Sequence, residues 1–172
     1  MKALWHTVFT LFLTKHPIPM RLIPSLLLLI LLCGCESLDF KKKDDRAAQL
    51  DELLQTDADF AETAREQGYR KAFMEFMDDD AVLLRDNYLP IIGGDAVRYV
   101  NSMNDTTFTV DWSPQAGDVS SAGDLGFTYG VYELRTDTER QTGTYVTVWR
   151  RNKEGRWRYV LDAGTQGTGE TE

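Results

Sequence analysis

The last 137 residues of this 172-residue chain contain no histidine and no cysteine, because both residue types fall within residues 1–35. Their absence excludes a histidine-based catalytic triad, a cysteine nucleophile, a histidine or cysteine zinc site and an intrachain disulfide from the body of the protein. Residues 36–172 carry 16 basic and 27 acidic side chains, a net charge of −11, which disfavours binding to nucleic acid. We therefore expect no nucleic-acid partner and no cofactor.

The chain also has no apolar run long enough to cross a membrane as a helix. Its longest run, residues 22–32, has eleven residues behind Arg21, too few for roughly 30 Å of hydrocarbon. A short apolar run behind a basic residue is typical of a signal peptide. Residues 1–19 add a second hydrophobic stretch, which is unusual in a signal, so Met1 and Met20 both remain open as the true start.

A four-residue motif follows the apolar run. Leu32-Cys33-Gly34-Cys35 resembles the bacterial lipobox, and this resemblance implies cleavage before Cys35 and acylation of its thiol. The lipid bilayer would then be a partner of the mature protein. Glu36 follows instead of Asp, which in this family favours an extracytoplasmic position at the outer membrane, facing the periplasm, if the organism is Gram-negative. The alternative is that Cys35 merely ends a hydrophobic stretch.

The remaining sequence predicts a charged tether followed by one domain. Residues 36–48 are polar without apolar periodicity, which predicts an irregular tether. Apolar residues at three- and four-residue spacing predict helices between Leu50 and Gly68 and from Tyr69 to Met77. A third helix is expected after Asp95, which would cap it. In the first of these helices, Thr56-Asp57 is a candidate cap in the middle of the run.

From Thr106 onward the apolar period changes to two, which is typical of β-strands. Strands are expected at 81–85 and from 106, and then at 124–135, 142–151 and 156–163, the last two joined by a hairpin turn at Gly155. Helices followed by strands predict an α+β domain over residues 49–164. We expect a cone, with the N-terminal helices on the concave face of a curved antiparallel sheet and a flexible tail at 165–172.

This order of elements resembles the SnoaL-like and ketosteroid-isomerase-like families of the nuclear-transport-factor-like superfamily, in particular a subfamily of unknown function. The resemblance lies in the segments 79–84, 89–96, 123–130, 143–150 and 157–162. It implies a conical pocket between helices and sheet and, frequently, a homodimer through the outer face of the sheet. Function does not follow, because this fold hosts isomerases, cyclases, dehydratases and binding modules.

Asp162 is the leading catalytic candidate, since a carboxylate desolvated at the end of the last strand could act as a general base. Strict alternation places it on the face opposite Tyr159, so it would point away from an aromatic cavity unless a bulge re-aims it. A structural role at the strand end is the alternative. Glu133 is a second candidate if its face of the sheet is covered.

Aromatic side chains supply the candidate walls of the pocket. Phenol and indole groups combine apolar area with one hydrogen-bond donor each, although core packing is an alternative role for every one of them. The candidates are Tyr69, Phe73, Trp112, Tyr129, Tyr132, Tyr145 and Trp149. Asp78-Asp79-Asp80 lacks the alternating spacing of a calcium loop, so we predict no metal site.

Three hypotheses for function follow. The first is a membrane-anchored lipoprotein whose domain binds a small hydrophobic molecule or acts as an accessory module. The alternative is an acid-base enzyme of the isomerase, cyclase or dehydratase type that acts on a small carbonyl compound, with Asp162 as base and a tyrosine as donor. The third is a structural dimer whose cone is filled by side chains.

Overall fold

A computed structural model describes the backbone of residues 23–167 and the side chains of residues 45–167. Contacts divide the chain into two compact units, residues 1–41 and 42–172. Both candidate starts and the last residues of the tail lie outside the described residues, as does the side chain of Cys35. None of the helices found between residues 23 and 167 combines the length and hydropathy that a membrane crossing requires.

The first helix, α1 (Ile23–Gln67), is longer than the sequence indicated. Residues 36–48, the predicted tether, are helical, and nothing between residues 36 and 67 is glycine or proline. Asp57 lies inside α1 and caps nothing. The buried stripe of the helix has helical spacing and consists of Leu53, Asp57, Phe60, Ala61 and Ala64. Gly68, with φ +94°, ends the helix as expected.

Two short helices follow, α2 (Tyr69–Phe76) and α3 (Gly94–Ser102). Both buried residues of α2, Ala72 and Phe73, belong to the predicted apolar stripe. Gly93, with φ +52°, is the N-cap of α3, and Asp95 lies in the first turn without a side-chain capping bond, so Asp95 is not the cap. Its carboxylate still opposes the positive end of the helix dipole.

Six strands form one curved sheet in the order β2-β1-β6-β5-β4-β3. Their bounds are β1 (Met77–Leu84), β2 (Ile91–Ile92), β3 (Phe108–Val119), β4 (Leu125–Thr136), β5 (Arg140–Arg151) and β6 (Trp157–Gln166). All pairs are antiparallel except β1 with β6, which the long intervening chain allows to run parallel. β6 also continues beyond Ala163 to Gln166, because Gly143 and Thr144 of β5 pair with this extension.

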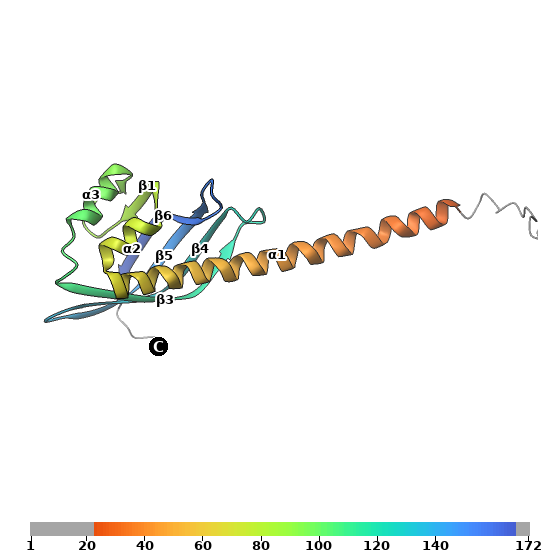
Figure 1. Ribbon diagram of the computed structural model, residues 1–172. Helices are drawn as coiled ribbons and strands as arrows, with labels where there is room; N and C mark the ends of the chain where they lie inside the picture. The colour runs from red at the N-terminus through yellow and green to blue at the C-terminus, as the bar shows by residue number, and fades with distance from the viewer. Residues whose placement is uncertain (1–22, 168–172) are drawn as a thin grey trace, which may run out of the picture. The chain divides into compact units, whose positions relative to one another are not determined.

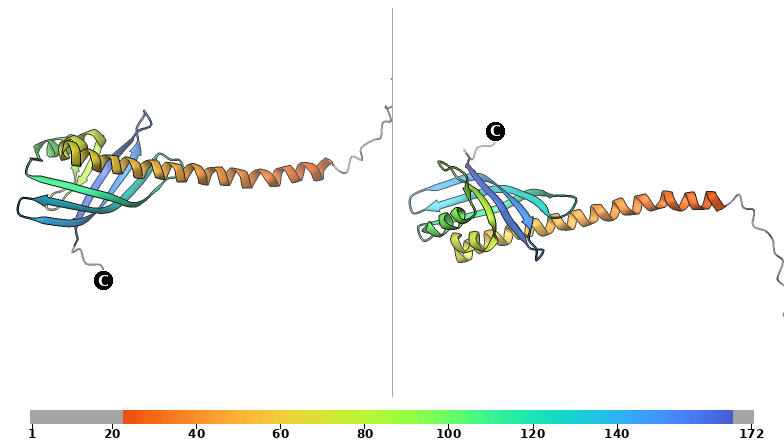
Figure 2. Two further views of the ribbon diagram at one scale, coloured as in Figure 1. Left: turned by 60° about the horizontal axis from the view of Figure 1, so that its bottom comes forward. Right: turned by 90° about the horizontal axis from the view of Figure 1, so that it is seen from above.

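The helices of the second unit pack on one face of the sheet, as Figures 1 and 2 show. The α+β fold with a curved, mostly antiparallel sheet is confirmed. Phe60 of α1 is the centre of the core between the layers: its ring lies 4.8 Å from Phe73, 4.7 Å from Trp112 and 5.7 Å from Tyr159, measured between centroids. Such edge and offset contacts each add about 0.5–1.5 kcal/mol beyond area burial.

A bulge in β6 decides which side chains face the concave side. Trp149 pairs with Tyr159 and Val148 pairs with Leu161, so Val160 is one residue more than β5 can match. An extra residue shifts the alternation of every following side chain by one position. Tyr159 and Asp162 are therefore both buried, 0% and 7% exposed, although they are three residues apart.

Candidate functional site

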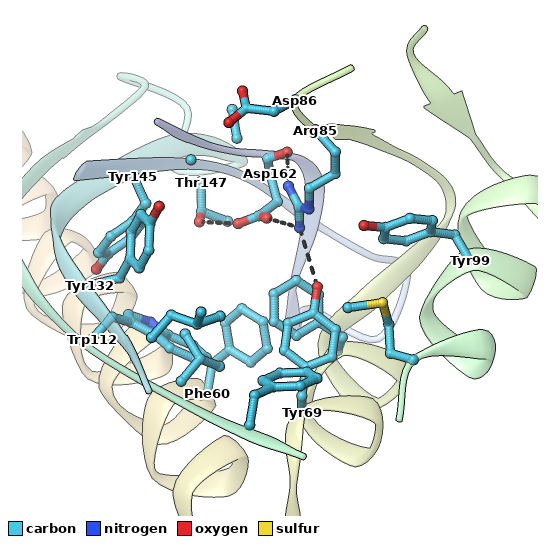
Figure 3. Close-up of a pocket in the computed structure, with 17 residues that line it drawn as sticks. Phe60, Tyr69, Arg85, Asp86, Tyr99, Trp112, Tyr132, Tyr145, Thr147 and Asp162 are labelled. Carbon is cyan, nitrogen blue, oxygen red and sulfur yellow. Dashed lines mark hydrogen bonds and ion pairs between the residues drawn. The ribbon is translucent and has the colours of Figure 1, made fainter. Parts of the chain in front are cut away.

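A cavity of about 320 Å³ opens between the helices and the concave face of the sheet (Figure 3). This volume suits a small organic ligand. Its wall is built from all three helices, the two residues that follow β1, and strands β3 to β6. Aromatic residues are the largest group in the wall, and they are Phe60, Tyr69, Phe73, Tyr99, Phe108, Trp112, Tyr132 and Tyr145.

Asp162 lies in the wall of this cavity, because the bulge at Val160 reverses the orientation that strict alternation gives. Its Oδ1 accepts a hydrogen bond of 2.5 Å from Nη2 of Arg85, and its Oδ2 accepts one of 3.0 Å from the hydroxyl of Thr147. Both carboxylate oxygens thus have a partner. The Asp162 side chain is only 10% exposed, so its ion pair with Arg85 is largely shielded from water.

Arg85 is the main cavity residue that the sequence analysis missed. Its Nη1 donates to the carbonyl oxygens of Leu84 at 2.9 Å and Asp162 at 3.0 Å, while Nη2 also lies 3.4 Å from the hydroxyl of Tyr69. Burial, the largest single influence, lowers the pKa of Arg85, but the charges and hydrogen bonds of Asp162 and Tyr69 together outweigh it and raise that pKa. The guanidinium therefore stays charged and is fixed in one orientation.

Tyr69 completes the polar end of the cavity. Burial, opposed by the nearby charge of Arg85, raises the pKa of Tyr69 to about 12. The phenol therefore keeps its hydrogen near neutral pH. Its oxygen accepts from Arg85, so the hydroxyl hydrogen remains able to donate to a ligand. We call Tyr69, Arg85, Thr147 and Asp162 the polar end of the cavity; Figure 3 shows them meeting there.

Trp112 and Tyr145 lie in another part of the wall and are held from behind by Asp57. The indole Nε1 of Trp112 donates to Oδ1 of Asp57 at 2.9 Å, and the hydroxyl of Tyr145 donates to Oδ2 at 2.8 Å. Burial raises the pKa of Asp57, although these hydrogen bonds oppose the shift. Burial and the adjacent carboxylate also raise the pKa of Tyr145. An acid within an apolar helical stripe was the signal that could have identified Asp57.

Six of the predicted site residues come together at the cavity: Tyr69, Phe73, Trp112, Tyr132, Tyr145 and Asp162. Three lie elsewhere. Tyr129 is on the outer face of the sheet and 45% exposed, whereas Trp149 is fully buried and donates to the hydroxyl of Thr128 at 2.8 Å. Glu133 alternates with the cavity residues Tyr132 and Leu134, so it faces outward, where Arg135 and Arg140 pair with it.

The first residue of the acidic run at the start of β1 pairs with a residue of another strand. Asp78 forms an ion pair of 2.9 Å with Arg150 of β5. Within residues 23–167, no cluster of three or more histidine, cysteine, aspartate or glutamate side chains is arranged to hold a metal ion.

Comparison with solved structures identifies the fold. A ketosteroid isomerase-like protein from Erwinia carotovora atroseptica matches with a TM-score of 0.55 and 14% identity, over 67% of this chain and 94% of that one. An NTF2-like protein with a cystatin-like fold from Novosphingobium aromaticivorans matches with a TM-score of 0.55 and 14% identity, over 70% and 82%.

An LEH-like epoxide hydrolase from M. tuberculosis also matches, with a TM-score of 0.51 and 13% identity over 69% of this chain and 80% of that one. No protein-family model matches the sequence, and neither does any curated protein. Neighbours on this fold thus include ketosteroid isomerase-like and epoxide hydrolase-like proteins. We conclude that the body of this chain is an α+β domain of the NTF2-like fold.

Proposed function

We propose that the domain binds a small, neutral and mainly apolar molecule that carries one polar group. The observation that supports this most strongly is the make-up of the cavity: aromatic residues are the largest group in its wall, and the ion pair of Arg85 and Asp162 lies at its polar end. Aromatic walls stabilise an apolar ligand by burial, while a few placed polar groups fix its orientation.

The charges at the polar end favour a neutral ligand. Arg85 is already neutralised by Asp162, so the pair offers little net charge to an anion. Tyr69 can still donate its hydroxyl hydrogen, and a carboxylate oxygen of Asp162 has lone pairs beyond the two bonds it accepts. A ligand carbonyl or hydroxyl group fits these partners.

A fluorescence titration with 2-naphthol, a neutral bicyclic probe with one hydroxyl, tests this proposal. We expect a dissociation constant on the order of 10–100 µM for the full chain in detergent. Val110→Trp should abolish binding because Val110 lines the cavity, whereas Val131→Trp, on the outer face of β4, should not. Circular dichroism checks that both variants fold. Equal binding by the two variants would contradict the proposal.

A second candidate is acid-base catalysis on a small carbonyl compound, with Asp162 as base and Tyr69 as donor. It is favoured by the inward position of Asp162, although Arg85 and Thr147 already occupy its two oxygens. Exchange of the α-hydrogens of 2-tetralone in D₂O, followed by NMR, measures such chemistry without a known substrate. If the wild-type protein and Asp162→Asn exchange at the same rate, this candidate is eliminated.

We also propose that Cys35 is acylated and anchors the protein outside the cytoplasm, at the outer membrane if the organism is Gram-negative. The Leu-rich run and the lipobox resemblance support this. Two or three acyl chains hold a protein almost permanently at a bilayer. Membrane fractionation and intact mass of Cys35→Ser provide the test: the variant should be unlipidated and released. If it remains in the membrane fraction and is normally processed, Cys35 is not the anchor.

The outer face of the sheet is proposed to take a second copy of the chain. Four neighbouring apolar side chains of β4 and β5 are more than a third exposed there: Phe127, Tyr129, Val131 and Val146. Charges flanking this patch already have partners, since Glu133 pairs with two arginines and Arg150 with Asp78. Such an apolar face suits self-association. Sedimentation should give a dimer for the wild type and a monomer for Tyr129→Lys.

A further inference from the structure

Asp57 is a buried acid that does not touch the cavity but holds two residues of its wall. It lies in the apolar stripe of α1 and is 0% exposed. The donors to its carboxylate, which include the indole of Trp112 and the phenol of Tyr145, are uncharged. No cation pairs with Asp57 among the side chains of residues 45–167. Burying a carboxylate without a paired cation costs free energy, so we expect Asp57 to have a specific role.

The two hydrogen bonds fix where the polar atoms of this wall point. Trp112 and Tyr145 come from β3 and β5, which β4 separates, yet their polar atoms converge on one carboxylate of the helix. The bond lengths of 2.9 and 2.8 Å are those of well-formed hydrogen bonds. An indole has a single polar hydrogen, and so has a phenol. Both hydrogens bond to Asp57, so neither is available to a molecule in the cavity.

We infer that Asp57 is a positioning residue that sets the specificity of the cavity, because it turns the polar atoms of Trp112 and Tyr145 away from the ligand and keeps that wall apolar. This inference rests on the proposed binding function and deepens it. The ligand class it predicts has a polar group at one end only. The polar group faces Tyr69 and Arg85, and the other end of the molecule is hydrocarbon or aromatic.

A pair of matched probes tests this specificity. 2-Naphthol has one hydroxyl, and 2,6-dihydroxynaphthalene adds a second hydroxyl at the opposite end. The wild-type full chain should bind the dihydroxy probe about 10–100-fold more weakly, because its second hydroxyl meets Trp112 and Tyr145, whose polar hydrogens both bond to Asp57. In Asp57→Asn, the amide NH₂ can donate to the Tyr145 oxygen, which releases the Tyr145 hydroxyl hydrogen. The discrimination between the probes should then fall by about fivefold or more.

Asp111→Asn is the matched control, since Asp111 precedes Trp112 on β3 but is exposed and pairs with Arg65. It should keep the wild-type ratio. Tyr145→Phe gives an independent result if Asp57→Asn does not fold: it removes an oxygen that never meets the ligand, so the ratio should stay within about twofold. If Asp57 had a purely structural role, Asp57→Asn would bind both probes more weakly by the same factor, and the ratio of their affinities would stay unchanged.

A ligand-free measurement tests the Asp57 to Trp112 hydrogen bond separately from ligand binding. The indole N–H resonance of Trp112 in the full chain should move as Asp57 takes up a proton, and should lose this pH dependence in Asp57→Asn. The other titratable groups that act on Asp57 or its partners are Tyr145 and Asp162, and both remain in the variant. If 2-naphthol does not bind the wild type, the proposed function fails and this inference with it. If the probe binds but Asp57→Asn keeps the wild-type ratio, only the role of Asp57 is overturned.

Discussion

Two buried aspartates lie beside the same cavity and are satisfied in opposite ways. Asp162 pairs with Arg85 and accepts a second bond from Thr147, whereas Asp57 accepts only from uncharged groups. The first arrangement keeps a charged pair exposed to the cavity. In the second arrangement, two neutral donors hydrogen-bond to an acid that lies behind the cavity wall. Asp162 thus forms part of the polar end of the cavity, whereas Asp57 keeps the polar hydrogens of two wall residues away from the cavity.

The two aspartates also differ in how a substitution should affect stability. An ion pair that is mostly buried stabilises little by itself, but breaking it leaves an unpaired charge in a poorly solvated place. An acid that accepts only from neutral donors has no partner charge to lose. Burial makes its protonation easier, although its hydrogen bonds oppose that effect. Substitutions at the two aspartate sites should therefore differ in size and in pH dependence.

The largest effect is expected at the polar end. Arg85→Met should lower the free energy of unfolding by about 3–5 kcal/mol, because it leaves Asp162 without its counter-charge. Urea denaturation at neutral pH measures this. The double variant Arg85→Met/Asp162→Leu should lose less than Arg85→Met alone. A loss below about 1 kcal/mol in Arg85→Met would mean that the pair is solvated and not part of a closed site.

A smaller loss is expected where a neutral donor to Asp57 is removed. Trp112→Phe should cost about 1–3 kcal/mol, since the buried carboxylate loses a hydrogen bond. Trp157→Phe is a matched control, because the buried indole nitrogen of Trp157 has no hydrogen-bond partner among the described residues. Urea denaturation of both variants gives the comparison. Equal losses would show that the Trp112 to Asp57 bond contributes nothing beyond packing.

Asp57 should also leave a signature in the pH dependence of stability. Its pKa is raised by burial above the ordinary 3.8, so the folded state takes up its proton before the unfolded state does. As the pH falls from neutral, the wild type should therefore gain stability relative to Asp57→Asn, and the gain should level off below about 3.8. Denaturation of both proteins across this range measures the difference. A difference that stays constant with pH would contradict a buried, titrating Asp57.

The smallest effect is expected outside the cavity. Glu133 faces the outer side of β4 and pairs with Arg135 and Arg140. Glu133→Gln should leave the affinity for 2-naphthol unchanged within about twofold, because surface pairs of this kind contribute little. A tenfold loss of affinity would mean that the outer face of the sheet, and not the concave face, carries the site.

The fold was largely predictable because it depends on periodic patterns. The change from helical spacing to alternation at about Thr106 marks the start of the long strands, and Gly68 and Gly155 mark turns that need positive φ. The site was predictable only in part. Alternation along β4 correctly separates the face of Glu133 from that of Tyr132, but the bulge at Val160 depends on pairing with β5, which a single sequence does not specify.

Arg85 and Asp57 were missed for a related reason. Arg85 follows an apolar strand and resembles an ordinary solvent-facing strand end; only the parallel pairing of β1 with β6 brings it to Asp162. Asp57 resembles a helix cap next to Thr56, and its role depends on two residues that lie 55 and 88 positions away in the chain. Long-range pairings of this kind create the chemistry of the cavity.

The most direct test of the cavity as a binding site is the tryptophan N–H spectrum of the full chain, titrated with 2-naphthol and assigned by single Trp→Phe variants. Trp112 lines the cavity, whereas Trp149 and Trp157 are buried in the core. We predict that the Trp112 indole resonance moves in a saturable manner while those of Trp149 and Trp157 stay in place. An unchanged Trp112 signal, or equal shifts of all three, would contradict it.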